Sequence, residues 1–146
     1  MIRKNYYIIF TLFLLILINS CSNKFEDNEI QINKVIGNLM EKPYNDIIVI
    51  PGEGCGGCIS SATYFVTENY ESLRDVAIVF TGVQDTKLLK NQIGDEFLNK
   101  ENVFIDSNNF LMKREVRSSY PYTLKMSSSR VTDFTLFEEA YFLNSK

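Results

Sequence analysis

Residues 46–58 read DIIVIPGEGCGGC, and this stretch decides the fold. Its first half contains the unbroken apolar run Ile47–Ile50, which is typical of a strand covered on both faces of a sheet. Its second half places Cys55 and Cys58 among four glycines, which pack no side chains and raise the entropic cost of order. The stretch therefore predicts a buried strand followed by a helix, with two thiols at the junction.

The rest of the chain alternates between helical and extended patterns. Apolar residues at helical spacing predict helices at 30–40, 59–73 and 85–93, a brief one at 109–116 and a short final one at 138–144. Apolar runs predict strands at 76–80 and 102–106, and a hairpin of strands at 122–126 and 131–137. Strands separated by helices pair in parallel through right-handed crossovers, whereas a hairpin is antiparallel. We therefore predict an α/β sandwich with a mixed central β-sheet.

The first twenty residues have the pattern of a targeting segment. A basic start precedes the uncharged apolar stretch 8–18, which is shorter than the about 20 residues that a membrane-spanning helix needs. Residues 18–21, Ile-Asn-Ser-Cys, resemble the lipobox of bacterial lipoproteins, in which the cysteine is lipidated and becomes the new N-terminus. The pattern indicates a lipoprotein signal peptide at residues 1–20 and a lipid-anchored Cys21.

This reading sets the domain organisation and the compartment. We expect residues 21–29 to form a polar tether and residues 30–146 to form one folded domain. The domain is then attached to the membrane of the cell envelope through Cys21, in the periplasm or at the cell surface, where disulfides form. A net charge of −3 leaves no basic surface for nucleic acid, and the absence of histidine excludes histidine-based catalysis.

With Cys21 assigned to the lipid anchor, Cys55 and Cys58 remain as a single pair. A structural disulfide would close a loop of four residues and stabilise the fold by only about 2 kcal/mol. Two thiolates could also hold Cu(I), although zinc would lack ligands in a chain without histidine. The third interpretation is a redox-active pair, which we favour, with no cofactor and no bound metal. At a strand-to-helix junction the positive end of the helix favours thiolate, so Cys55 is the predicted nucleophile and Cys58 the resolving thiol.

A strand, a CxxC pair opening a helix, and a later Ser119-Tyr120-Pro121-Tyr122-Thr123 segment together resemble the thioredoxin fold. The spacing is most similar to the TlpA/ResA-type membrane-anchored thiol–disulfide oxidoreductases. The resemblance covers roughly residues 32–137 and implies a thioredoxin-like three-layer sandwich. It also implies that the protein exchanges disulfides with protein thiols and disulfides, and that its partners include an unidentified electron donor. It also implies substrate binding by Gly54, Tyr120 and Pro121, with a cis peptide bond before Pro121 that leaves the backbone of Tyr120 available to an extended substrate.

The sequence departs from the family where a proton acceptor for the second thiol is expected. Val49 and Ser61 stand at the positions where related proteins carry acids, and Glu53 is the nearest acidic residue. Two alternatives therefore stay open beside the oxidoreductase: a Cu(I)-binding, metallochaperone-like module, and a redox-degenerate thioredoxin-like accessory lipoprotein.

Overall fold

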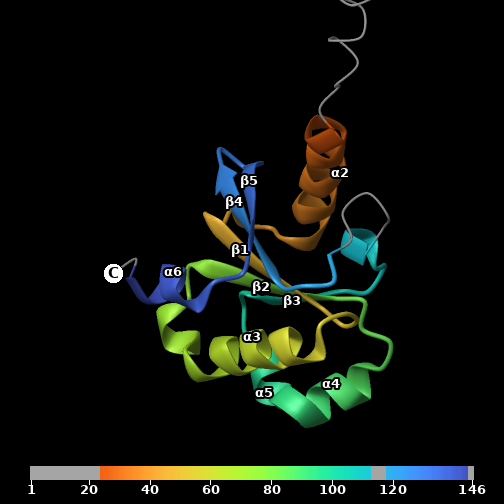
Figure 1. Cartoon of the computed structure of the whole chain (residues 1–146), viewed down its shortest axis with the longest axis vertical. Coiled ribbons are helices and arrows are strands. Elements are labelled where there is room, and N and C mark those ends of the chain that lie inside the picture. Colours follow the sequence, from red (N-terminus) through yellow and green to blue (C-terminus); the bar gives the residue numbers. More distant parts are fainter. Residues whose placement is uncertain (1–23, 113–117, 145–146) are drawn as a thin grey trace, which may run out of the picture.

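The structure is a computed structural model that describes residues 24–112 and 118–144 (Figure 1). The predicted signal peptide and Cys21 lie outside the described residues. The first described helix, α2 (Lys24–Leu39), begins within the segment that we assigned to a tether, so residues 24–29 are helical. No helix among the described residues combines the length and the apolar character needed to cross a bilayer.

A five-stranded mixed sheet forms the centre of the molecule, with strand order β3-β2-β1-β4-β5. The first three strands of the chain pair in parallel, and the last two add antiparallel to the side of β1. The prediction of an α/β fold with a mixed sheet is therefore confirmed. The strands are β1 (Asp46–Pro51), β2 (Val76–Thr81), β3 (Val103–Asp106), β4 (Tyr122–Ser127) and β5 (Arg130–Leu136).

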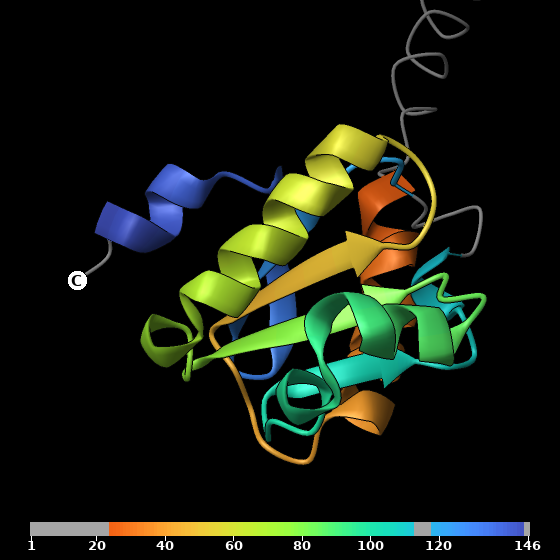
Figure 2. The same cartoon turned by 90° about the horizontal axis from the view of Figure 1, so that it is seen from below.

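Helices cover both faces of this sheet and make three layers (Figures 1 and 2). On one face, α2 and the short 3-10 helix η2 (Phe110–Met112) pack over a first hydrophobic cluster. The opposite face carries a second cluster beneath four helices. These are α3 (Gly56–Glu68), α4 (Thr86–Ile93), α5 (Asp95–Leu98) and α6 (Glu139–Asn144).

The central strand β1 explains why its sequence is apolar without interruption. Ile47 and Val49 belong to the cluster under α2, whereas Ile48 and Ile50 belong to the cluster under α3. All four side chains are at most 1% exposed. Successive residues of a strand point to opposite faces, so a strand covered on both sides needs apolar residues at every position.

Two predicted elements differ from the structure in extent. The extended piece at 102–106 is an edge strand of the sheet, and the brief helix expected at 109–116 is present as η2, with residues 113–117 outside the description. The hairpin turns at Ser128 and Ser129, which both have positive φ, 50° and 63°. Two consecutive residues in this region match the twist of antiparallel strands, so the hairpin closes without glycine.

Candidate functional site

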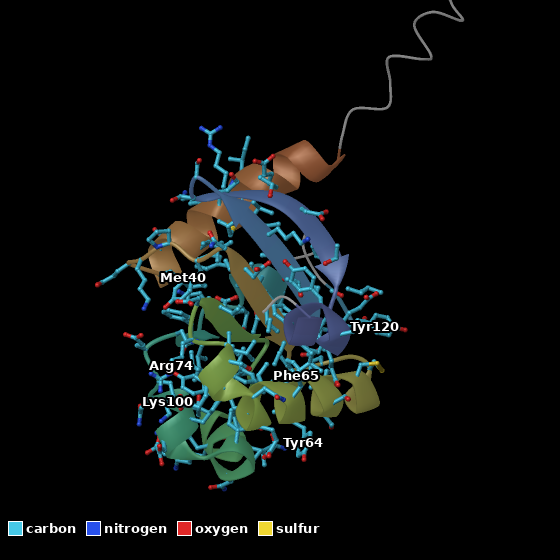
Figure 3. All side chains as sticks on the ribbon, turned by 90° about the vertical axis from the view of Figure 1, so that its left-hand side faces the viewer. Met40, Tyr64, Phe65, Arg74, Lys100 and Tyr120 are labelled. Carbon is cyan, nitrogen blue, oxygen red and sulfur yellow. A yellow bond between two sulfur atoms is a disulfide. The ribbon has the colours of Figure 1, made fainter. Side chains whose placement is uncertain are left out.

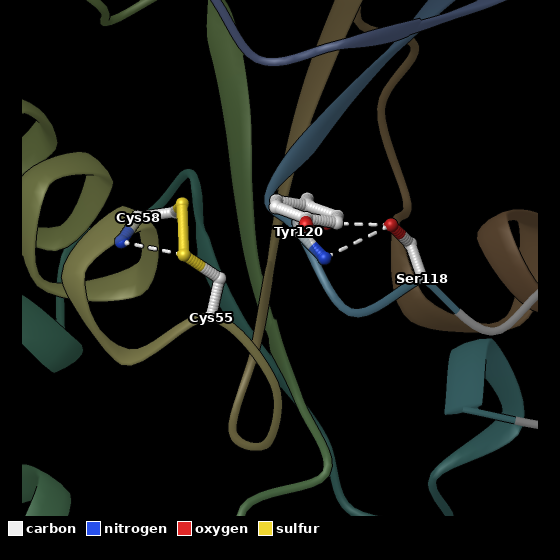
Figure 4. The surroundings of a disulfide bond; sticks show 4 residues. All are labelled: Cys55, Cys58, Ser118 and Tyr120. Atoms are coloured by element: carbon white, nitrogen blue, oxygen red, sulfur yellow. Dashed lines mark hydrogen bonds between the residues drawn. A yellow bond between two sulfur atoms is a disulfide. The ribbon is translucent and has the colours of Figure 1, made fainter.

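The two cysteines lie at the junction between β1 and α3, as the sequence predicts. Cys55 is the N-cap residue of α3, and its sulfur accepts a hydrogen bond from the backbone N–H of Cys58 at 3.4 Å. A disulfide joins Cys55 to Cys58 (Figure 4). Free N–H groups of a first helical turn and the positive end of the helix dipole stabilise negative charge on a sulfur at this place.

The disulfide is partly open to solvent because the two residues between the cysteines are glycines, which have no side chain. Both cysteines are half-buried, whereas Gly56 and Gly57 are exposed. A Cβ added to either glycine would meet no atom within 4 Å. No packing contact therefore requires glycine at these two positions, and their effect is to leave the approach to the sulfurs unobstructed.

Gly54 holds the cysteine loop against the segment that leads to Pro121. Its φ is +134°, and a Cβ at this position would lie 2.2 Å from the carbonyl oxygen of Ser119. The next residue, Cys55, donates its backbone N–H to that same oxygen at 2.8 Å. Only glycine permits this approach, so one backbone contact fixes the distance between two loops far apart in the sequence.

Two of the predicted substrate-binding residues, Tyr120 and Pro121, line a cavity together with Cys58, whereas Gly54 lines a different depression. A cavity of about 190 Å³, which we call the Cys58 cavity, is lined by Cys58, Ser61, Tyr120, Pro121, Leu136, Phe137 and Glu139. Pro121 is buried, and its carbonyl oxygen accepts the N–H of Phe137 at 3.0 Å. Tyr120 is 50% exposed and lies on the same side of the molecule as the sulfur atoms at the start of α3 (Figure 3).

The Pro121 segment differs in two ways from what the resemblance implies. Throughout the described residues every peptide bond is trans, including the one before Pro121, in line with the general preference of about 0.5–1 kcal/mol for trans X-Pro bonds. The backbone of Tyr120 is also engaged rather than available. Its N–H donates to the Ser118 hydroxyl oxygen at 3.1 Å, and that hydroxyl donates to the Tyr120 carbonyl at 2.8 Å (Figure 4). A peptide that paired with the Tyr120 N–H would first have to displace the Ser118 side chain, whereas the Tyr120 carbonyl can accept a second hydrogen bond.

The acidic residue that shares a cavity with Cys58 comes from the final helix, which the sequence analysis predicted but did not connect with the cysteines. Ser61, on α3, donates its hydroxyl to Glu139 Oε1 at 3.2 Å across 78 positions of sequence. Glu53, the nearest acid in the sequence, instead accepts from Gln84 at 3.0 Å and does not line the Cys58 cavity. A search for acids close in sequence to the cysteines could not have found Glu139.

A second, larger depression adjoins the other side of the cysteine loop. This groove of about 590 Å³ runs between α3 and α4 from Gly54 and Gly56 to Ile93. The described residues that line it carry no charge, and Tyr64 on its wall is 68% exposed. The cysteine loop thus lies between a small cavity lined by a carboxylate and a larger groove lined by apolar and uncharged polar residues.

Residues 24–112 and 118–144 contain no cluster of three or more cysteine, aspartate or glutamate side chains that could hold a metal ion.

No protein-family model matches the chain, and no curated protein or solved structure matches it either.

Proposed function

We propose that this chain is a lipid-anchored, extracytoplasmic thiol–disulfide oxidoreductase with a thioredoxin-like fold. The observation that carries the proposal is the half-exposed Cys55–Cys58 pair at the start of α3, tied through the Cys55 N–H to the backbone of Ser119 beside Pro121. A disulfide of this kind stabilises the fold little, because closing a loop of four residues contributes only about 2 kcal/mol to the free energy of unfolding. Accessible sulfurs at a helix N-terminus are suited to exchange instead.

The fold supports the same proposal. Along the chain, the helix that begins at the cysteines lies between the parallel strands β1 and β2. The antiparallel pair β4 and β5 starts directly after Pro121. Helices lie on both faces of this sheet. This arrangement is compatible with the three-layer thioredoxin-like sandwich that the TlpA/ResA-type resemblance implies. It differs from the β-α-β-β-α-β order of the ferredoxin-like domains to which the Cu(I)-binding alternative belongs.

The chemistry runs in two balanced steps. In the reduced protein the Cys55 thiolate attacks one sulfur of a substrate disulfide, which breaks, and the departing substrate thiolate takes a proton from solvent. A mixed disulfide now joins Cys55 to the substrate. Cys58 then loses its proton and attacks the Cys55 sulfur, so the mixed disulfide breaks and the second substrate thiol leaves. The protein is oxidised by two electrons and the substrate is reduced by two, and the same steps in reverse oxidise a substrate dithiol.

The surroundings of the disulfide favour polypeptide substrates over small thiols. The cysteine loop separates two concave surfaces, the Cys58 cavity and the α3–α4 groove, and both are open to solvent and rich in apolar side chains. An extended polypeptide that presents a cysteine to Cys55 can lay its flanking residues on these surfaces. Anchoring through Cys21, which lies outside the described residues, would hold this reaction at the surface of a membrane in the cell envelope.

The variant Cys58→Ala tests the proposal. Without the resolving thiol the mixed disulfide has no intramolecular attacker, so reduced Cys58→Ala mixed with a peptide disulfide should accumulate a covalent adduct. Mass spectrometry should find the protein plus one half of the peptide, and the adduct should disappear after addition of dithiothreitol. The wild type should show the adduct only transiently, with a lifetime at least about ten times shorter.

The double variant Cys55→Ala/Cys58→Ala is the matched control and should form no adduct. Absence of an adduct with Cys58→Ala would contradict the proposal. Stoichiometric Cu(I) binding by the reduced wild type, without any disulfide exchange, would establish the metal-binding alternative in its place.

A further inference from the structure

The second step of the proposed reaction needs a group that accepts the proton of the Cys58 thiol. An ordinary cysteine thiol titrates near 8.5, so most of it is protonated at neutral pH and is a weak nucleophile. Cys55 is the N-cap residue of α3, whereas Cys58 lies within the first turn and donates its own backbone N–H to the Cys55 sulfur. The helix end therefore favours charge on Cys55, and Cys58 needs another group to accept its proton.

Among the described residues, one carboxylate lines the Cys58 cavity. Cys58, Ser61 and Glu139 all line this cavity of about 190 Å³. Ser61 follows Cys58 by three positions on α3, and residues three apart on a helix are neighbours on its surface. The Ser61 hydroxyl donates to Glu139 Oε1 at 3.2 Å, which keeps the carboxylate at the wall of the cavity.

The position of Glu139 is set by the packing of α6 on α3. Phe142 of α6 is buried, and its ring lies 6.4 Å from that of Phe65 on α3 and 5.8 Å from that of Phe137. The rings of Phe65 and Phe137 are themselves 5.5 Å apart. These three aromatic rings place α6 beside α3 (Figures 1 and 2), so the residue that begins α6 lies against the first turns of the cysteine helix.

Few other ionisable groups compete for this role. Among the described residues that line the cavity, Tyr120 has the only titratable side chain besides those of Cys58 and Glu139. Asp46 and Lys125 contact α6 through Tyr141, at the Tyr141 hydroxyl and ring respectively, and neither lines the cavity. Glu138 neighbours Glu139 in the chain, but it does not line the cavity either.

We propose that Glu139 is the proton acceptor for Cys58 and that Ser61 is a positioning residue for its carboxylate. This inference rests on the proposed oxidoreductase function. When the mixed disulfide has formed on Cys55, the Cys58 proton moves to the Glu139 carboxylate, and the Cys58 thiolate attacks the Cys55 sulfur. The bond between Cys55 and the substrate breaks, and the substrate thiolate leaves with the electron pair. Glu139 is exposed, so the proton passes from it to water or to the departing thiolate.

The test separates the two chemical steps. Reduced protein is mixed with a symmetrical peptide disulfide, the reaction is quenched with acid at set times, and mass spectrometry quantifies reduced protein, mixed disulfide and oxidised protein. General base catalysis contributes about 10²–10⁴-fold in enzymes, and Glu139→Gln should slow resolution of the mixed disulfide by at least about tenfold at pH 7. Formation of the mixed disulfide, which depends on Cys55, should stay within about twofold of the wild-type rate. Ser61→Ala should slow resolution by a smaller factor, because it leaves the carboxylate present but no longer held.

The matched control is Glu138→Gln, which makes the same change of charge one position away and should leave both steps unchanged. The pH dependence of the resolution rate is a second measurement, which would not change if Glu139 had only a structural role. Resolution by Glu139→Gln should rise about tenfold per pH unit between pH 6 and 8, as the thiolate fraction of Cys58 rises, and should approach the wild-type rate at high pH. The wild-type rate should depend less steeply on pH.

Two results would overturn the inference. One is a Glu139→Gln variant that resolves the mixed disulfide as fast as Glu138→Gln; the other is an equal slowing of formation and resolution that high pH does not rescue. Failure of the proposed function itself looks different, because no mixed disulfide would then form in any variant, Cys58→Ala included.

Discussion

Replacing Cys55 with serine is expected to lower the rate of disulfide exchange by at least about a thousandfold, because a hydroxyl is not appreciably ionised at neutral pH and cannot take the place of a thiolate. Cys55 is the residue at the N-cap of α3, where the free N–H groups of the first turn stabilise a charged sulfur. The measurement is the initial rate of insulin reduction by the protein in the presence of dithiothreitol.

Cys58→Ser is the matched comparison for this variant, since it removes the same disulfide by the same substitution. It should also turn over slowly, but its remaining thiol should still form the mixed disulfide at a rate close to that of the wild type. The assignment of roles would be contradicted by the reverse pattern, in which Cys55→Ser still forms a mixed disulfide with the peptide and Cys58→Ser does not.

Gly54→Ala is expected to damage both the fold and the site. A Cβ at this position would lie 2.2 Å from the carbonyl oxygen of Ser119 and 2.7 Å from its Cα, and these are backbone atoms that cannot rotate away. The φ of +134° is also a conformation that residues with a side chain rarely adopt. We expect the free energy of unfolding to fall by about 2–4 kcal/mol, measured by denaturant titration. The exchange rate should fall as well, because the Cys55 loop and the Pro121 segment are pushed apart.

Gly57→Ala is the control for this prediction because it makes the same substitution three positions later. A Cβ there would meet nothing within 4 Å, and alanine favours the helix over glycine by up to about 1 kcal/mol. This variant should be as stable as the wild type or slightly more stable. If both variants lost the same free energy of unfolding, the contact between Gly54 and Ser119 would not have the importance that we give it.

The strands and the mixed character of the sheet could be predicted from the sequence because their signals are local, whereas the strand order was not predicted. The apolar run Ile47–Ile50 reports burial on both faces, and the alternation after Tyr122 with a serine-rich turn reports a hairpin. The pair Cys55 and Cys58 could be placed at a strand-to-helix junction for the same reason. In each case residues adjacent in the chain carry the whole signal.

The features that were missed depend on contacts between distant segments. Glu139 lines the Cys58 cavity because three aromatic rings pack α6 against α3. No sequence pattern near the cysteines indicates this packing. The occupation of the Tyr120 backbone by the Ser118 hydroxyl is a choice of side-chain rotamer, which a sequence pattern does not specify. The resemblance implies substrate binding by Gly54, and the structure adds a separate requirement for glycine at this position, which is the close approach of Ser119.

The most direct test is the reactivity of the two thiols in the reduced protein. Iodoacetamide alkylation is followed between pH 5 and 10, and peptide mass spectrometry assigns the modified cysteine at each pH. We expect Cys55 to react first, with a midpoint below the value of about 8.5 for an ordinary thiol, and Cys58 to react only at higher pH. If instead Cys55 titrates like a free cysteine, or if Cys58 is alkylated first, the proposed nucleophile and the mechanism built on it are wrong.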